Sequence, residues 1–200
     1  MQLVSSPASP FVRKVRLMIL ETGQADDIEI VDVATTPTEP HPTVSSANPM
    51  SKIPALVRPD GCTLYDSRVV TRYLDARVNA GLYPADRIWE TLTLEATGDA
   101  IMDAGVLMVY EGRCRPEDMQ FGGWLDVQWG KIEGALDALN SRWIDHLSGP
   151  LDMGHVSVGC ALAYLDFRHD VRNWRAGRDA LDDWFAVFAQ RESFAATSPV

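Results

Sequence analysis

Residues 48–56 read Asn-Pro-Met-Ser-Lys-Ile-Pro-Ala-Leu. The run starts inside residues 34–51, which are rich in Pro, Thr and Ser and therefore have the composition of a loop. Its last two residues belong to Ala55-Leu56-Val57, which reads as a short strand. A loop that ends in proline before a strand makes the Ile53–Pro54 bond a candidate cis peptide, although a lone Ile-Pro is usually a plain turn. This stretch therefore marks where a long loop enters a sheet.

The segment upstream of this loop predicts a β-α-β unit. Leu3-Val4 reads as a strand, and Ser9-Pro10 as a helix start, because serine is a good N-cap and proline suits the first helical position. Apolar residues then recur at helical spacing, at Phe11, Val15, Met18 and Ile19. Gly23 suits the end of that helix, and residues 28–33 read as a second strand. Two strands joined by a crossover helix normally lie parallel.

The segment downstream predicts a hairpin and a helix. Residues 55–57 and 62–65 read as two short strands, joined by a Pro-Asp-Gly turn sequence. Asp66-Ser67 then caps a helix whose apolar face carries Val69, Val70, Tyr73 and Leu74. The first half of the chain is therefore an α/β arrangement of β-α-β followed by β-β-α.

The second half of the chain predicts helices only. Residues 88–111 form a long helical stretch, and further helices run through residues 125–143, around 160–165 and through 181–188. A break near residues 79–84 separates the halves. We expect an α/β domain at residues 1–78, a linker at 79–86 and an all-helical domain at 87–200.

Composition and charge exclude several kinds of partner. The chain has 200 residues, 46% of them hydrophobic and 23% charged, which is ordinary for a globular protein. Its net charge of -10 would be repelled by duplex DNA and by anionic membrane surfaces, so we expect neither as a partner. Residues 1–78 carry 8 Lys and Arg against 9 Asp and Glu, and the rest carry 10 against 19. A small anionic ligand therefore suits the near-neutral N-terminal part better.

Cysteine and histidine usage predicts a cytoplasmic protein without a metal site. The three cysteines and four histidines are scattered, and no pair has the spacing of metal ligands or of a redox motif. Polar residues 5–10 interrupt any secretory signal at the N-terminus. No apolar run approaches the ~18 residues of a membrane-spanning helix.

This order of elements resembles that of a glutathione transferase. The similarity lies in residues 9–15, 48–56 and 64–67, and further on in residues 99–104 and 160–168, so it spans nearly the whole chain. The resemblance implies a thioredoxin-like N-terminal domain that binds glutathione and an all-α C-terminal domain. It also implies a homodimer in which each N-terminal domain packs on the partner's helical domain.

The resemblance implies that Ser9 activates glutathione. A hydroxyl at the positive end of a helix can donate a hydrogen bond to a thiolate, which lowers the pKa of the glutathione thiol. Phe11, two residues on, belongs to the same segment of the implied site. Taken alone, Ser9 would more often be only an N-cap, and Ser5 and Ser6 are alternative hydroxyls. A cysteine at position 9 would have implied a thiol-disulfide reductase, and none precedes Cys62.

The remaining implied ligands of glutathione lie in the loop and at the second helix start. The resemblance implies that Pro54 is cis, that the backbone of Ile53 pairs with the cysteinyl unit, and that Lys52 approaches the glycyl carboxylate. It implies that Ser67 binds the γ-glutamyl carboxylate and that Asp66 accepts a hydrogen bond from the γ-glutamyl ammonium. Many relatives have glutamate at the position of Asp66. Taken alone, these residues would read as a turn, a solvated lysine and a helix cap.

The second half carries weaker expectations. The electrophile site should lie between the halves, with Met102, Val106, Tyr110 and a last helix carrying Trp174 as candidate linings. Asp99 and Asp103 lie four residues apart on one helix. Either one of them faces the cleft or the partner subunit, or both belong to a solvated acidic face. In the family the buried helix usually begins with a Ser/Thr-x-x-Asp capping box, and His155 and Val158 stand at those two positions here. Ser157 is therefore the expected cap.

We therefore expect an enzyme that adds the glutathione thiolate to a small apolar electrophile, a reaction typical of detoxification. The family also contains glutathione-dependent isomerases and dehalogenases, which the sequence does not separate from transferases. A non-catalytic glutathione-binding or scaffold protein with the same fold is the alternative from another class. The joint presence of Ser9, Lys52, Ile53, Pro54, Asp66 and Ser67 argues against that alternative.

Overall fold

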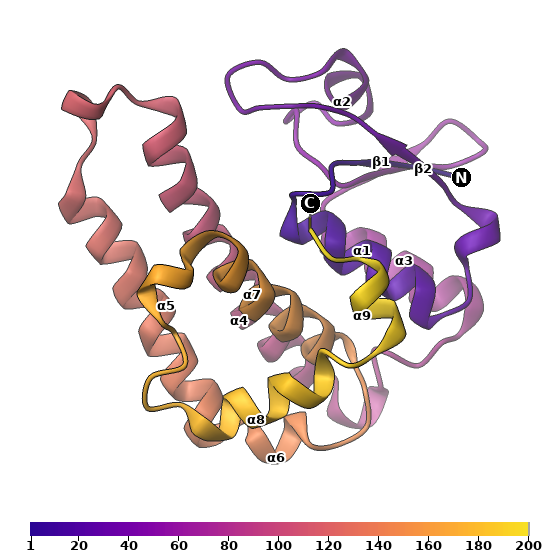
Figure 1. The fold of residues 1–200 in the computed structure, drawn as a ribbon. Helices are drawn as coiled ribbons and strands as arrows, with labels where there is room; N and C mark the ends of the chain where they lie inside the picture. Colours follow the sequence, from indigo (N-terminus) through magenta and orange to yellow (C-terminus); the bar gives the residue numbers. More distant parts are fainter. Residues whose placement is uncertain (200) are drawn as a thin grey trace. The chain divides into compact units, whose positions relative to one another are not determined.

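The computed structural model describes residues 1–199 and divides into two compact units. The N-terminal unit contains Met1–Tyr83 together with the segment from Glu192 onward, and the helical unit contains Pro84–Arg191 (Figure 1). The end of the chain, which we expected in the helical domain, groups with the N-terminal unit, and the division between Tyr83 and Pro84 falls inside the expected linker at 79–86. Among residues 1–199, no helix combines the length and the apolar character needed to cross a bilayer.

The N-terminal unit is built on a four-stranded mixed sheet with the strand order β2-β1-β3-β4. The strands are β1 (Gln2–Ser5), β2 (Glu29–Asp32), β3 (Ala55–Val57) and β4 (Thr63–Leu64). β1 and β2 are parallel, with Leu3 opposite Ile30, as a crossover helix requires. β3 runs antiparallel to both β1 and β4, which confirms the predicted hairpin.

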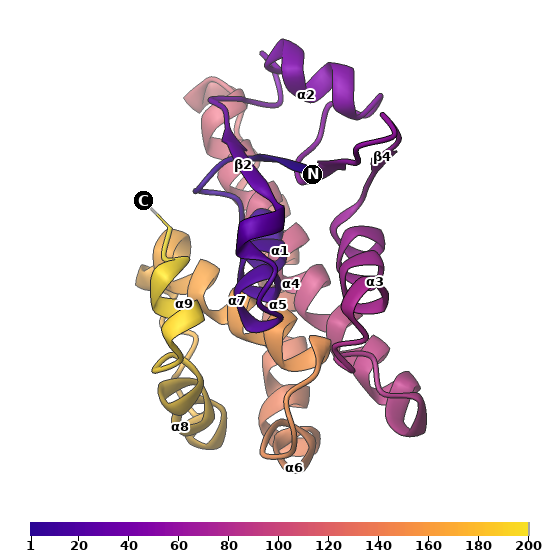
Figure 2. The ribbon, with the colours of Figure 1, turned by 90° about the vertical axis from the view of Figure 1, so that its right-hand side faces the viewer.

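Three helices of this unit cover the sheet. α1 (Pro10–Glu21) and α3 (Ser67–Val78) pack against one another on one face, and α2 (Pro42–Ala47) lies on the other (Figure 2). α2 lies in a segment that composition predicts to be a loop, so that prediction was wrong. Its six residues are capped by His41, whose Nδ1 accepts from the Thr43 N–H at 3.2 Å. The helix forms because Val44 and Ala47 are buried against Val4 and Ala55 of the sheet.

The end of the chain is held by α1. α9 (Glu192–Ala196) lies against α1, and the guanidinium of Arg13 donates to the carbonyl of Phe194 at 3.0 Å. The same guanidinium lies 3.9 Å from the centre of the Phe194 ring, which adds a cation–π contact. Arg13 is therefore buried although it is charged, and its partner lies 181 residues away in the sequence.

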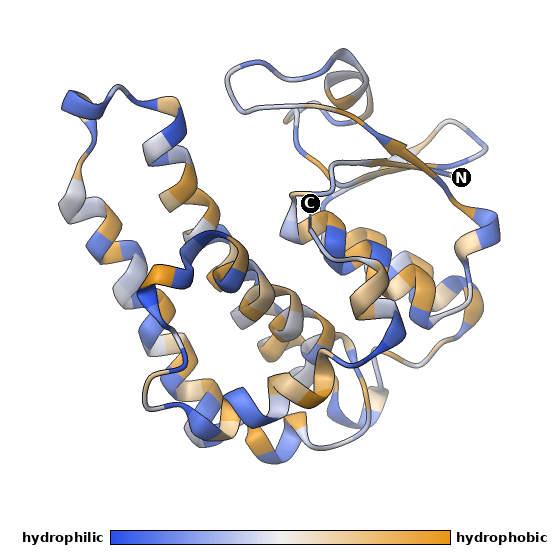
Figure 3. Ribbon diagram, in the orientation of Figure 1, coloured by the Kyte–Doolittle hydropathy of each residue, from blue (hydrophilic) through white to orange (hydrophobic). Residues whose placement is uncertain are grey.

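The helical unit is organised around α4 and α7, which have the most extensive contacts in the chain. Its helices are α4 (Ile88–Cys114), α5 (Gly122–Arg142), α6 (Ile144–Leu147), α7 (Met153–His169) and α8 (Asp179–Phe188). Hydrophobic and hydrophilic residues alternate along α8, which buries Leu181, Phe185 and Phe188 (Figure 3). α7 is buried along most of its length, as the sequence predicts.

Two local expectations for the helical unit were wrong. Asp152 is the N-cap of α7, and Ser157 lies inside the helix. Trp174 is not on a helix but in the turn before α8, where it is 1% exposed and its indole N–H donates to Asp166 at 2.7 Å. The start of α7 is fixed by the side-chain hydrogen bonds of Asp152 and not by hydrophobic periodicity. α8 begins at Asp179, after Trp174.

Candidate active site

Three segments that carry the expected site residues leave the sheet at the same end. Val4 near the end of β1 is opposite Ala55 at the start of β3, and Leu56 is opposite Leu64 at the end of β4. The turn before α1, the loop before β3 and the turn before α3 therefore emerge side by side. The N-termini of α1 and α3 follow at once, so two positive helix ends lie near this end of the sheet.

Ser9 is the N-cap of α1, as predicted. Its Oγ accepts a hydrogen bond of 3.3 Å from the Val12 N–H, and Pro10 occupies the first helical position. A hydroxyl has one proton besides its two lone pairs, so Ser9 can cap the helix and still donate to a bound anion. No acidic residue lies in the first turn of α1, which leaves the positive end of its dipole uncompensated. Ser5 is fully buried, which makes Ser9 and Ser6 the more accessible hydroxyls.

The loop before β3 has the predicted cis peptide at Ile53–Pro54. Pro54, directly before β3, is buried, whereas Lys52 is exposed and Ile53 is half-buried. Ser51 has a φ of 52°, which places it in the left-handed region that few residues other than glycine adopt. The loop is therefore a defined structure that offers an exposed ammonium and a strand-like backbone next to it.

Asp66 and Ser67 form the start of α3. Asp66 is the N-cap and accepts from the Arg68 N–H at 3.0 Å, and Ser67 is the first residue of the helix and is 3% exposed. The carbonyl of Ser67 accepts from the Thr71 hydroxyl at 2.9 Å, and that hydroxyl also pairs with the Tyr83 hydroxyl at 2.8 Å. These bonds hold the first turn of α3 in place, and the positive end of the helix there suits a carboxylate.

The structure separates the candidate linings of the electrophile site into two groups. Met102 is fully buried and Trp174 is nearly so, which makes both of them core residues. Val106 is half-buried and Tyr110 is 38% exposed, so these two can meet a ligand. Burial, helped by the neighbouring Cys114 thiol, raises the pKa of Tyr110, so its hydroxyl stays protonated at neutral pH and can donate a hydrogen bond. Phe11 is half-buried near the start of α1.

One open depression lies a turn beyond Tyr110, in a place that the sequence did not indicate. It has a volume of about 310 Å³ and is lined by Glu111, Arg115, Phe121 and Trp124. The Glu111 carboxylate accepts from the Phe121 N–H and from Arg115 Nε, both at 3.0 Å. The Glu111 carboxylate in this depression is therefore already paired, whereas the Arg115 side chain is 54% exposed.

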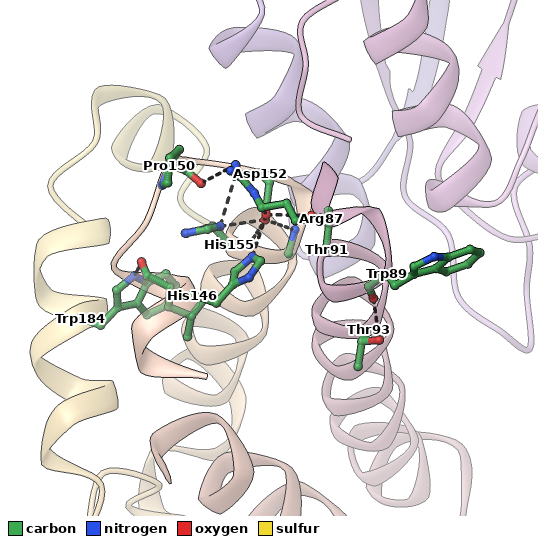
Figure 4. A network of polar contacts seen from close by, with 11 residues as sticks. Arg87, Trp89, Thr91, Thr93, His146, Pro150, Asp152, His155 and Trp184 are labelled. Atoms are coloured by element: carbon green, nitrogen blue, oxygen red, sulfur yellow. Dashed lines mark hydrogen bonds and ion pairs between the residues drawn. The ribbon is translucent and has the colours of Figure 1, made fainter. Parts of the chain in front are cut away.

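A second polar cluster surrounds Asp152 at the start of α7 (Figure 4). One ligand-type atom each from His146, Asp152 and His155 lies within 4.8 Å of the others, an arrangement that can hold a metal ion. His146 Nε2 and His155 Nδ1 each lie 2.8 Å from a carboxylate oxygen. The sequence missed this cluster because its members come from two helices and a capping position with no motif spacing.

The carboxylate of Asp152 is already saturated with donors. Oδ1 accepts from the N–H groups of Gly154 and His155 at 2.9 and 3.3 Å. Oδ2 accepts from the Thr91 hydroxyl at 2.8 Å and from Arg87 Nε at 3.4 Å. A metal ion would displace these donors and would face a guanidinium and the positive end of α7. The donor set therefore favours a hydrogen-bonded anchor that joins four elements of the helical unit.

Burial and the neighbouring donors act in opposite directions on the pKa of the Asp152 carboxyl. Burial by itself raises the pKa of the Asp152 carboxyl, but hydrogen bonds from His155, Thr91 and His146 outweigh it and hold the pKa well below its usual range. Asp152 is therefore a carboxylate throughout the physiological range. Because Nδ1 of His155 faces this carboxylate, Nε2 on the far side of the ring points away, and it has no hydrogen-bond partner among residues 1–199.

Comparison with known proteins agrees with this architecture. The family model described as the N-terminal domain of glutathione S-transferase matches residues 8–77, and the C-terminal domain model matches residues 122–186. The uncharacterized GST-like protein YibF of Escherichia coli is 33% identical over 205 residues, and the match covers 100% of this chain and 98% of YibF.

Two solved structures from Pseudomonas fluorescens are also similar. A glutathione transferase family member with bound glutathione is 42% identical with a TM-score of 0.97, covering 100% of this chain and 98% of that one. A structure with bound S-(propanoic acid)-glutathione is 40% identical with a TM-score of 0.92, covering 100% of both chains. With both family models and a full-length relative in agreement, this chain belongs to the glutathione S-transferase family.

Proposed function

We propose that the protein is a glutathione transferase that lowers the pKa of the glutathione thiol and presents the thiolate to a small apolar electrophile. One observation carries the proposal. The turn before α1, the cis-proline loop and the start of α3 emerge at one end of the sheet with two helix N-termini beside them. Glutathione carries two carboxylates, an ammonium and a thiol, and this arrangement offers a matching partner for each.

The proposed roles follow from the positions of the side chains. Ser9 donates its hydroxyl proton to the sulfur, and the dipole of α1 favours the thiolate. The backbone of Ile53 pairs with the cysteinyl unit, and Lys52 meets the glycyl carboxylate. Ser67 and Asp66 bind the carboxylate and the ammonium of the γ-glutamyl unit. The support for these roles is local geometry together with the glutathione bound by a 42% identical relative.

A small unsaturated acid is a second candidate for the electrophile. The relative that binds S-(propanoic acid)-glutathione holds a conjugate of the kind that a three-carbon unsaturated acid would form. In that reaction the thiolate attacks the β-carbon, the electron pair of the double bond moves to an enolate, and the α-carbon then takes a proton. Val106 and Tyr110 are the candidate contacts for either kind of electrophile, and the Tyr110 hydroxyl can donate to a carbonyl oxygen.

We further propose a homodimer that works in detoxification in the cytoplasm. Large apolar side chains are exposed on both units, on α3 and its approach at Tyr65, Val69 and Val78, and on α4 at Trp89 and Leu107. Such residues on a soluble fold suit an interface between copies. Among residues 1–199 the three cysteines form no disulfide, which suits a reducing compartment. Sedimentation equilibrium at several protein concentrations tests the dimer.

A conjugation assay tests the proposed reaction. Glutathione loss is followed with an aryl halide, with acrylate and with a disulfide as separate second substrates. We expect thiol loss with formation of a thioether from one of the first two. A dehalogenase or isomerase would instead regenerate glutathione while changing the second substrate. Binding of glutathione without turnover of any substrate would favour the scaffold alternative, and turnover of the disulfide would contradict the role given to Ser9.

A further inference from the structure

We propose that Asn48 is a positioning residue of the glutathione site, which aims the backbone N–H of Ile53 at the ligand. This inference rests on the proposed function, because it concerns how that site is held in shape. Asn48 is the C-cap residue of α2, lies outside the set of expected ligands, and is 3% exposed. A buried amide side chain in a loop needs partners for its donor and its acceptor, and the loop provides both.

Each polar group of Asn48 makes a hydrogen bond within the loop. Its N–H donates to the carbonyl of Val44 at 2.8 Å, and its carbonyl accepts from the Ser51 N–H at 2.8 Å. The side-chain Oδ1 accepts from the Met50 N–H at 2.9 Å, and Nδ2 donates to the carbonyl of Lys52 at 2.9 Å. One residue therefore joins the end of α2, the turn at 49–51 and the peptide that precedes Ile53.

The bond to Lys52 has a consequence for Ile53. The carbonyl of Lys52 and the N–H of Ile53 belong to one planar peptide group. That group is trans, since the cis bonds among residues 1–199 are Ile53–Pro54 and Tyr65–Asp66. In a planar trans peptide the carbonyl and the N–H point in opposite directions. Holding the Lys52 carbonyl toward Asn48 therefore turns the Ile53 N–H away from the loop interior. That N–H is the group proposed to pair with the cysteinyl unit of glutathione.

A second contact supports the same loop conformation. The hydroxyls of Ser45 in α2 and Ser51 in the loop are 3.0 Å apart, and Ser51 has the unusual φ of 52°. α2 itself is anchored by Val44 and Ala47 against the sheet. α2 therefore stabilises the loop, although none of its six residues is expected to contact glutathione.

The test distinguishes the hydrogen bond that Asn48 Nδ2 donates from the space that the side chain fills. Asn48→Asp keeps the shape and the acceptor for Met50 but places an oxygen where Nδ2 donates to Lys52. Asn140→Asp is the matched control, because Asn140 Oδ1 also accepts a backbone N–H, that of Leu181 at 3.0 Å, but in the helical unit. Glutathione affinity is measured by calorimetry, and amide hydrogen exchange of residues 49–53 is measured on the free proteins.

We expect Asn48→Asp to weaken glutathione binding about tenfold, a loss of about 1.4 kcal/mol, and to speed exchange in the loop. KM for glutathione should rise with kcat little changed, and Asn140→Asp should alter neither readout. Faster exchange with unchanged affinity would overturn the positioning role, and so would unchanged exchange and affinity. If the unaltered protein binds no glutathione, the proposed function itself fails, which the same titration shows before any variant is compared.

Discussion

The hydroxyl of Ser157 in α7 donates a hydrogen bond of 2.9 Å to the carboxylate of Asp99 in α4. The carbonyl of Glu95 lies 3.0 Å from the same hydroxyl oxygen. Asp99 is 1% exposed, so it is part of the core of the helical unit and not of a solvated acidic face. The two helices come close enough for this contact because residue 98 is a glycine, whose missing side chain leaves room for α7.

Gly98→Ala should therefore destabilise the protein. An added Cβ would lie 2.6 Å from the backbone carbon and 2.8 Å from the carbonyl oxygen of Ser157, so the helices would have to separate. We expect a loss of about 1–3 kcal/mol in the free energy of unfolding, measured by urea titration. Gly112→Ala is the control in the same helix, because nothing lies within 4 Å of its Cβ. That variant should gain about 0.5–1 kcal/mol, and equal effects of the two changes would refute the packing explanation.

Asp152→Asn should make the free energy of unfolding depend less on pH in the acidic range. The folded-state pKa of this carboxyl is depressed, so its stabilisation is present above the unfolded pKa of about 4 and is lost as the pH falls below it. We expect the variant to lose about 3–5 kcal/mol near pH 7, because a buried ionic network is broken. The difference in unfolding free energy between the variant and the unaltered protein should shrink as the pH falls from 5 to below the unfolded pKa of about 4.

Thermal unfolding between pH 7 and pH 3 measures this difference. Asp126→Asn is the control, since the Asp126 side chain is 77% exposed and its ion pair with Arg172 is long, at 3.9 Å. That change should leave stability within about 0.5 kcal/mol at every pH. A constant difference between Asp152→Asn and the unaltered protein over the whole range would show that the carboxylate charge is not what stabilises α7.

Zinc should not stabilise the cluster of His146, Asp152 and His155. Besides the two imidazoles, the carboxylate oxygens of Asp152 already accept from four donors, which are the N–H groups of Gly154 and His155, the Thr91 hydroxyl and Arg87 Nε. We expect the unfolding midpoint to be the same in zinc and in a chelator. A rise in zinc that disappears in His146→Ala, but persists in the control His41→Ala, would show that the cluster is a metal site.

Ser9→Ala should raise the pKa of the bound glutathione thiol. The change removes a donor that favours the thiolate, so the thiolate absorbance of the binary complex should appear at higher pH. We expect kcat at neutral pH to fall about 100-fold, the scale of losing one donor to a developing anion. Loss of the helix cap should cost about 1 kcal/mol of stability besides. Ser9→Thr keeps the hydroxyl and should retain most of the activity, whereas an unshifted titration in Ser9→Ala and a shifted one in Ser6→Ala would move the role to Ser6.

The sequence predicted the elements whose signals are local. Ser9-Pro10 marked the start of α1, and Asp66-Ser67 marked the start of α3, because capping chemistry acts within one turn. The hairpin followed from its turn residues, and the parallel pair followed from the crossover helix. These elements place the loop and both helix starts at one end of the sheet, so most of the candidate site could be predicted.

The parts that could not be predicted depend on contacts between distant residues. α2 is too short for a periodic signal and exists because Val44 and Ala47 meet the sheet. The return of α9 to the N-terminal unit rests on Arg13 and Phe194, which are 181 positions apart. The anchor at Asp152 and the burial of Trp174 likewise arise from partners that no spacing rule connects.

Titration of the protein with reduced glutathione, compared with Ser67→Ala, tests the central claim most directly. Ser67 is buried at the first position of α3, where its hydroxyl and N–H are proposed to hold the γ-glutamyl carboxylate. Ser148→Ala, at an exposed position of the helical unit, is the control. We predict micromolar to millimolar binding that Ser67→Ala weakens clearly and Ser148→Ala leaves unchanged. No detectable binding at several millimolar glutathione would contradict the account and leave a transferase fold used as a scaffold.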